Sequence, residues 1–192
     1  MVLVFPAFLG LVLGYLAGGR IERLALVRFK HIELFFVAFL VQIVAFPFAW
    51  LPWTTNATLG TVLWLLSFAL VAAGAWLNRH IFGIPVVAAG LASNVVAVGV
   101  NGGHMPALPS ALAAANEHYV VSNNSARMAS PHLSWLVDRW AVPNGLPFGN
   151  VYSIGDVIIA VGIVLVVVVA MGTVVPRISS TTLADERQVI GQ

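Results

Sequence analysis

The 192-residue sequence contains no cysteine and few charged residues. The missing cysteine excludes disulfide bonds, thiol nucleophiles and cysteine-ligated metal sites. Charged residues make up 8% of the chain, against about 25% in a typical soluble domain, which is too few to cover the surface of a soluble fold. Basic patches interleaved with aromatic residues are also missing, so no nucleic-acid partner is expected.

Hydrophobic residues, by contrast, make up 60% of the chain and gather in blocks of nearly membrane-spanning length. Five such blocks occupy residues 2–18, 34–50, 59–77, 84–100 and 154–175. Basic residues follow the first block rather than precede it, which indicates a retained helix and not a cleaved secretory signal. The sequence therefore predicts an all-α membrane bundle of about five transmembrane helices. It would form a single domain over residues 1–175, with a flexible cytoplasmic tail at 176–192.

The distribution of lysine and arginine predicts the orientation, because cytoplasmic loops are enriched in these residues. With the amino terminus outside, seven of the nine basic residues lie in inner segments, and Arg127 and Arg139 lie in outer ones. Trp50 and Trp53 fall in an outer turn, where an aromatic belt is expected. We therefore expect a multi-pass protein of the bacterial cytoplasmic (inner) membrane, with its carboxyl terminus in the cytoplasm.

The polar loop at residues 101–152 would lie on the outer face. Ser110 can cap a short helix over residues 111–118. Ser130, followed by proline, predicts a second helix that runs to about Trp140. This helix would lie along the membrane surface with an apolar face toward the lipid.

The segment from Asn101 to His104 stands where the fourth apolar block ends. Gly102 and Gly103 allow a tight backbone there, so the segment is either a helix stop or a backbone cradle that binds a polar group. Three histidines of the loop are fourteen residues apart. That spacing matches no zinc pattern, and no metal site is predicted.

Two outer aspartates are the main candidates for chemistry. Asp156 lies near a helix amino terminus, where the dipole favours a carboxylate, and Asp138 could pair with Arg139 or Arg127. The alternative is a catalytic dyad. Two adjacent carboxyl groups do not ionise together, so one keeps a proton and the pair can activate a water molecule against a peptide bond.

Small and polar residues inside the apolar blocks point to contacts between helices. Gly10, Gly14 and Gly18 form a stripe that allows close helix packing, either within the chain or against another membrane subunit. Gln42 and Asn94 need hydrogen-bond partners in a membrane. Membrane lipids are the expected partners. No cofactor is predicted, and a bound lipid or quinone between the helices is the alternative.

Two resemblances bear on function. The order of NGGHMP at residues 101–106, WLVD ending at Asp138 and SIGD ending at Asp156 resembles a bacterial membrane family of uncharacterised function. That resemblance covers most of the chain, from the first apolar block through the fifth. It implies a multi-span membrane protein and supplies no activity.

Residues 136–170 also resemble the end of the lipoprotein signal peptidases. There a second aspartate about eighteen residues after the first opens the last helix, behind a stretch with proline, an aromatic residue and asparagine. By this resemblance Asp138 and Asp156 would be the dyad, with Asn150 orienting nearby. The chain departs from that family in its five apolar blocks instead of four spans, in lacking two asparagine motifs, and in Arg139 after the first aspartate.

These observations leave three functional hypotheses. The leading one is a non-enzymatic accessory or structural subunit of a membrane complex. The second is an aspartic membrane peptidase that uses Asp138 and Asp156. The third is a small protein that binds or transports a lipid or quinone in a cleft between helices.

Overall fold

The computed structural model describes residues 4–45, 56–117, 121–122, 125–147 and 149–172. Five long helices follow the five apolar blocks: α1 (Val4–Leu16), α2 (Glu33–Ala45), α3 (Ala57–Leu77), α4 (Ile84–Val100) and α6 (Ile154–Ala170). In these described ranges, α3 contains the one helical stretch, Thr58–Leu77, that is long and apolar enough to cross a membrane. The other four helices have 13 or 17 residues each. The predicted tail and the two outer-turn tryptophans lie outside the described residues.

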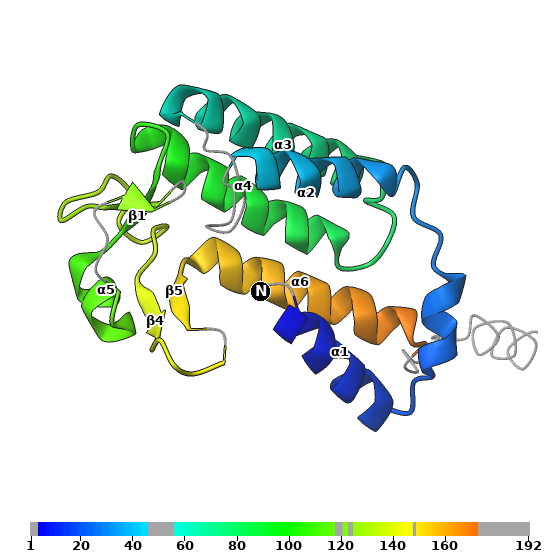
Figure 1. Ribbon diagram of the computed structural model, residues 1–192. Helices are drawn as coiled ribbons and strands as arrows, with labels where there is room; N and C mark the ends of the chain where they lie inside the picture. Colours follow the sequence, from blue (N-terminus) through cyan, green and yellow to red (C-terminus); the bar gives the residue numbers. More distant parts are fainter. Residues whose placement is uncertain (1–3, 46–55, 118–120, 123–124, 148, 173–192) are drawn as a thin grey trace, which may run out of the picture.

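The long helices pack in the order α2, α3, α4, α6, α1 (Figure 1). The closest approach joins α4 and α6, which run antiparallel. A Cβ atom built on Gly90 would lie 2.6 Å from the carbonyl oxygen of Gly155. Gly162 similarly meets the start of α4, where its Cβ would lie 2.7 Å from the Val87 nitrogen. Because the two backbones touch, polar side chains near the end of α4 come opposite the first turn of α6.

The glycine stripe of α1 faces the same last helix. A Cβ on Gly10 would lie 2.8 Å from the Cβ of Val167, and Gly14 packs against Met171. Gly18 has a φ of +81°, and a Cβ built on it would meet no atom within 4 Å. The chain itself therefore covers the first two positions of the stripe, and a second subunit on this face stays a prediction.

Polar contacts join α2 to α3. The Gln42 amide donates to the Ser67 hydroxyl over 2.8 Å, and that hydroxyl donates to the Trp64 carbonyl over 2.7 Å. Asn78, which is completely buried, accepts from the Lys30 amide over 2.7 Å and donates to the Lys30 carbonyl over 2.8 Å. These bonds satisfy polar groups that an apolar interior would otherwise penalise.

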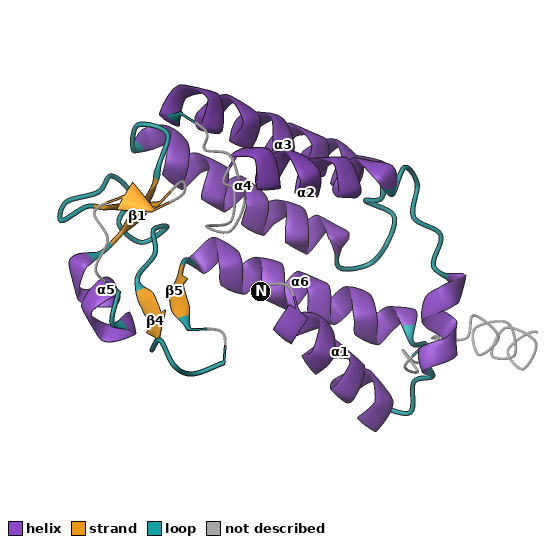
Figure 2. Cartoon of the chain, in the orientation of Figure 1, coloured by secondary structure: helices purple, strands orange, loops and turns teal. Residues whose placement is uncertain are grey.

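The loop between α4 and α6 holds short strands and one short helix, gathered at one end of the helical body (Figure 2). Its elements are β1 (Met105–Ala107), α5 (Pro109–Ala115), β2 (Val121–Ser122), β3 (Ser125–Arg127), β4 (Trp140–Val142) and β5 (Asn150–Tyr152). β3 pairs parallel with β1 and antiparallel with β2, and β4 pairs antiparallel with β5. The chain is thus mostly helical, but the expected all-α class omitted these two small sheets.

Two details of the predicted loop are wrong. The short helix begins at Pro109, with Leu108 at the N-cap position, so Ser110 is inside it. The second helix, which was to end at Trp140, is absent from the described residues 131–140. These residues form turns with Leu133 at a φ of +50°, followed by a β-bridge at Asp138.

Pairing with β1 explains the missing helix. The Asp138 amide donates to the Pro106 carbonyl over 2.9 Å, and the Asp138 carbonyl accepts from the Leu108 amide over 3.0 Å. Leu136, two residues earlier, is 6% exposed and packs beside Trp64 of α3 and residues of α4 and β1. The pairing thus satisfies the Asp138 backbone groups that a helix would have bonded internally, and the burial of Leu136 adds apolar stabilisation.

Candidate aspartate site

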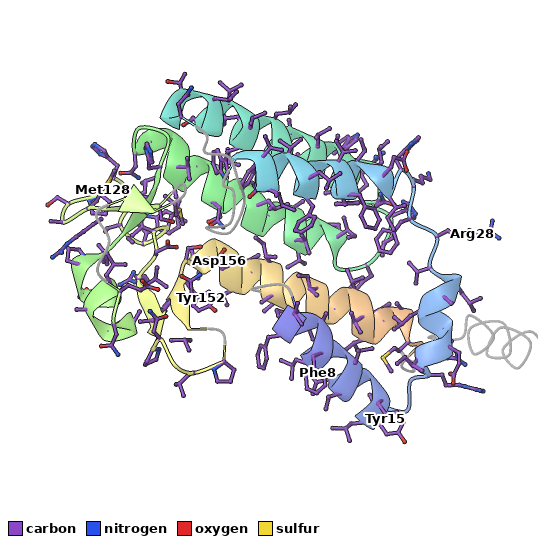
Figure 3. All side chains as sticks on the ribbon, viewed as in Figure 1. Phe8, Tyr15, Arg28, Met128, Tyr152 and Asp156 are labelled. Atoms are coloured by element: carbon purple, nitrogen blue, oxygen red, sulfur yellow. The ribbon has the colours of Figure 1, made fainter. Side chains whose placement is uncertain are left out.

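The structure brings Asp138 and Asp156 to the same polar cavity, which has a volume of about 180 Å³. Asp138 comes from the loop, beside β1, and Asp156 from the first turn of α6. Further polar lining comes from Asn94, Ser125 and Asn150, and apolar side chains of α3 and α4 close other sides. Figure 3 shows Asp156 where the loop enters α6, next to Tyr152. Aspartates eighteen residues apart thus contribute to one site.

Local sequence fixes the position of Asp156. Ser153 is the N-cap of α6, and its hydroxyl accepts from the Asp156 amide over 3.1 Å. In return, Asp156 Oδ2 accepts from the Ser153 amide over 2.9 Å. This reciprocal pair is a capping box, and it puts a carboxylate at the positive end of the helix dipole. Asp156 therefore has the structural role that the sequence predicted, a carboxylate at the amino terminus of a helix.

Asn94 holds the other oxygen of the same carboxylate. Its side-chain Nδ2 donates to Asp156 Oδ1 over 3.0 Å, and the Ser153 hydroxyl lies 2.9 Å from Asn94 Oδ1. Glycine at 155 makes this possible, because a Cβ there would collide with the Asn94 side chain. The sequence indicated that Asn94 needs a partner, but only the α4–α6 contact identifies that partner as Asp156.

Asp138, by contrast, is buried in the protein, and only 5% of its surface is exposed. Burial, and then the negative charge of Asp156, raise the pKa of Asp138 to about 8. The same two causes raise the pKa of Tyr152. Among the described residues, no ion pair joins Asp138 to Arg139 or Arg127. At neutral pH the Asp138 carboxyl therefore keeps its proton beside a charged neighbour.

The residues predicted to bind a polar group divide between two places. Asn150 lines the aspartate cavity, whereas the segment from Asn101 to His104 does not. The Asn101 side chain donates to the Ala97 carbonyl over 2.7 Å and to the His132 carbonyl over 3.0 Å, and it accepts from the His132 amide over 2.8 Å.

Gly102 and Gly103 follow with φ values of +74° and +89°, a region of backbone conformation that favours glycine. The segment ends α4, and Asn101 bonds the loop residue His132 to that end. This arrangement agrees with the first of the two alternatives, a helix stop. Ligand binding by Asn101, Gly102, Gly103 and His104 stays a prediction.

The sequence pattern of one protein family matches residues 26–168. The chain belongs to the DUF5317 family, a family of unknown function. The matched region contains both aspartates, Asn94 and the whole loop between α4 and α6. The expected membership of an uncharacterised family is thus confirmed. No curated protein and no solved structure matches the chain.

In this DUF5317 chain the cavity combines a protonated carboxyl with a hydrogen-bonded carboxylate. The first can donate a proton and the second can accept one, as general acid–base catalysis requires. Sequence reasoning missed Ser125 and the aromatic wall of Trp64 and Phe68. No motif marks these three residues, because only tertiary packing brings them to the cavity.

Proposed function

We propose that the chain is a multi-pass membrane protein that hydrolyses an amide bond of a membrane-associated peptide, using Asp138 and Asp156 as an acid–base pair. One observation carries the proposal. The two carboxyl groups line one small polar cavity, and burial together with a negative neighbour keeps a proton on Asp138 at neutral pH. Proton sharing between two carboxyl groups is the arrangement by which aspartic proteases activate water.

An inside-out distribution of side chains supports the membrane part of the proposal. Phe8 and Tyr15, which are 62% and 74% exposed, point away from the neighbouring helices (Figure 3). Phe36 on α2 is 63% exposed. Glycine and hydrogen-bonded polar residues occupy the helix contacts instead. Large apolar side chains facing outward are costly in water and favourable in lipid.

The positions of the basic segments support the proposed orientation. Arg23 donates to the carbonyl of Gly172 over 3.0 Å, and Lys30 bonds to Asn78 through its backbone. The segments that the distribution of lysine and arginine predicts to be cytoplasmic thus lie together. They are at the end of the helical body opposite the loop with the aspartates (Figure 1). This separation is what a positive-inside topology with an outer loop requires.

The proposed reaction uses both protonation states. A water molecule between the carboxyl groups gives a proton to Asp156 while its oxygen attacks the amide carbonyl carbon. Asp138 gives its proton to the carbonyl oxygen, so the intermediate is a neutral gem-diol. A gem-diol proton then returns to Asp138, Asp156 protonates the amide nitrogen, and the C–N bond breaks. The products are a carboxylic acid and an amine, and both aspartates regain their starting states.

The test is to reconstitute the wild-type chain in vesicles with a mixture of membrane peptides and to identify new amino termini by mass spectrometry. Asp138→Asn and Asp156→Asn should each abolish the cleavages while the helical content remains. Glu22→Gln is a matched control, because Glu22 is exposed and lies at the end of the helical body opposite the aspartates (Figure 1). Cleavage that persists in both aspartate variants would refute the peptidase.

The second candidate function is the non-enzymatic subunit of a membrane complex. The exposed apolar face of α1, which includes Phe5 and Leu16, supports it because such a face fits another membrane helix as well as lipid. Purification in mild detergent tests it. A stable partner that is lost when Phe8 is changed to serine would support this function, and a monomer without partners would count against it.

A further inference from the structure

An apolar groove of about 780 Å³ runs between α3 and α4, separate from the aspartate cavity. Alanines form much of its lining, among them Ala69, Ala72, Ala88 and Ala92. These short side chains leave space where larger ones would let the two helices interlock. The groove has the size of small-molecule binding sites, about 300–1,000 Å³.

One end of the groove carries a cation. Arg79, just beyond the end of α3, lines the groove together with Trp76. Its Nη1 donates to the Trp76 carbonyl over 2.8 Å, and its guanidinium stacks 4.4 Å from the centre of the Trp76 ring. These contacts keep the charge at the mouth of the groove, and a guanidinium has further N–H donors for a phosphate.

A second basic residue lies close to this end. The buried side chain of Asn78, next to Arg79, holds the backbone of Lys30 through two hydrogen bonds. Glu33, the acidic residue at the start of α2, is engaged by His31 over 2.8 Å. Arg79 is therefore the charged residue of the groove lining, and the Lys30 backbone is held beside the same end of α3.

We infer that the α3–α4 groove binds one acyl chain of an anionic phospholipid, with the lipid phosphate on Arg79. The polarity of the groove matches that of the lipid, because its cation stands at one end and its interior is apolar. From Trp76 to Leu65 the groove follows α3 for about 17 Å at 1.5 Å per residue, and Arg79 lies just beyond the Trp76 end. Leu65 and Phe68 line the apolar end of the groove, and Phe68 also forms a wall of the aspartate cavity.

This charge distribution favours a lipid over a second copy of the chain. A helix laid into the groove would place side chains along its whole length, whereas the groove offers a charged group at one end. The basic mouth also lies at the end proposed to face the cytoplasm, where anionic lipids concentrate and attract basic residues.

The test titrates the full chain, purified in mild detergent, with phosphatidylglycerol or phosphatidylcholine and counts bound lipids by native mass spectrometry. The wild type should bind phosphatidylglycerol about fivefold more tightly, as expected for one basic residue at a lipid phosphate. Arg79→Gln should remove this preference and Arg79→Lys should keep most of it. Arg139→Gln, in the loop at the opposite end of the helical body, should leave the preference for phosphatidylglycerol unchanged.

A second pair of variants tests the groove itself. Ala72→Phe should fill the groove and lower the affinity for both lipids, and Ala92→Leu should do so by a smaller factor. Ala73→Phe is the matched control, since Ala73 is exposed and lies outside the groove lining.

Equal binding of the two lipids by the wild type, or unchanged binding in both groove variants, would overturn the inference. So would a shift between dimer and monomer in Ala72→Phe, because the occupant would then be a second copy. Asp138→Asn should bind lipid like the wild type, so the result is independent of the proposed peptidase.

Discussion

The buried Asp138 carboxyl should make the protein less stable as the pH rises. Its pKa is raised from 3.8 to about 8, mainly by burial and then by the charge of Asp156. A carboxyl with a raised folded-state pKa contributes its full stability below pH 3.8 and loses it progressively up to about pH 8. At about 1.4 kcal/mol per pKa unit the loss is roughly 4 to 6 kcal/mol.

Asparagine at this position removes the effect, because its side chain is neutral in the folded and unfolded states at every pH in this range. Asp138→Asn should therefore unfold at a nearly constant temperature between pH 5 and pH 9, while the wild type unfolds at steadily lower temperatures. The difference in unfolding temperature between the variant and the wild type should stop growing near pH 8. Thermal unfolding in mild detergent, followed by circular dichroism, measures this difference, and Glu22→Gln should follow the wild type.

Asp156→Asn separates the two causes of the raised pKa of Asp138, which are burial and the charge of Asp156. Removing its charge should lower the pKa of Asp138 only in part, since burial is the larger cause. A variant Asp138→Asn that loses stability with pH as steeply as the wild type would refute the reasoning. The pH dependence would then come from another group, and Asp138 would not hold a proton at neutral pH.

Three further predictions concern the same cavity. Gly155→Ala should displace Asn94 and lower stability by about 1–3 kcal/mol in chemical unfolding, whereas Gly99→Ala, with no atom within 4 Å of the added Cβ, should be neutral or slightly stabilising. Ser153→Ala should cost about 1 kcal/mol in the same assay through the lost cap, and an unchanged midpoint would contradict the role of the capping box. If the proposed peptidase is correct, its rate should fall above about pH 8 as Asp138 loses its proton; a rate still rising at pH 9 would exclude Asp138 as the acid.

Much of the fold could be predicted because the deciding interactions are local. The apolar block at residues 84–100 coincides with α4, and α3 ends with its block at Leu77. Backbone hydrogen bonds within an apolar segment are satisfied by a helix whatever surrounds it. The capping role of Asp156 is local in the same way, since its partner Ser153 is three residues away.

The loop could not be predicted in the same manner. Ser130 and the following proline favour a helix start, yet Asp138 pairs with the backbone on either side of Ala107, about thirty residues earlier in the chain. The energetic gain of that pairing and of burying Leu136 depends on where β1 lies. No local propensity contains this information.

The sequence by itself determined the apolar segments, the small number of charges, their concentration in a few segments, and two aspartates eighteen positions apart. Only the tertiary structure decided that these aspartates line one cavity, that Asn94 binds Asp156 from 62 residues away, and that Asp138 is buried. Carboxyl chemistry depends on desolvation and on nearby charge. Both are set by groups that packing brings together, and spacing along the chain does not fix them.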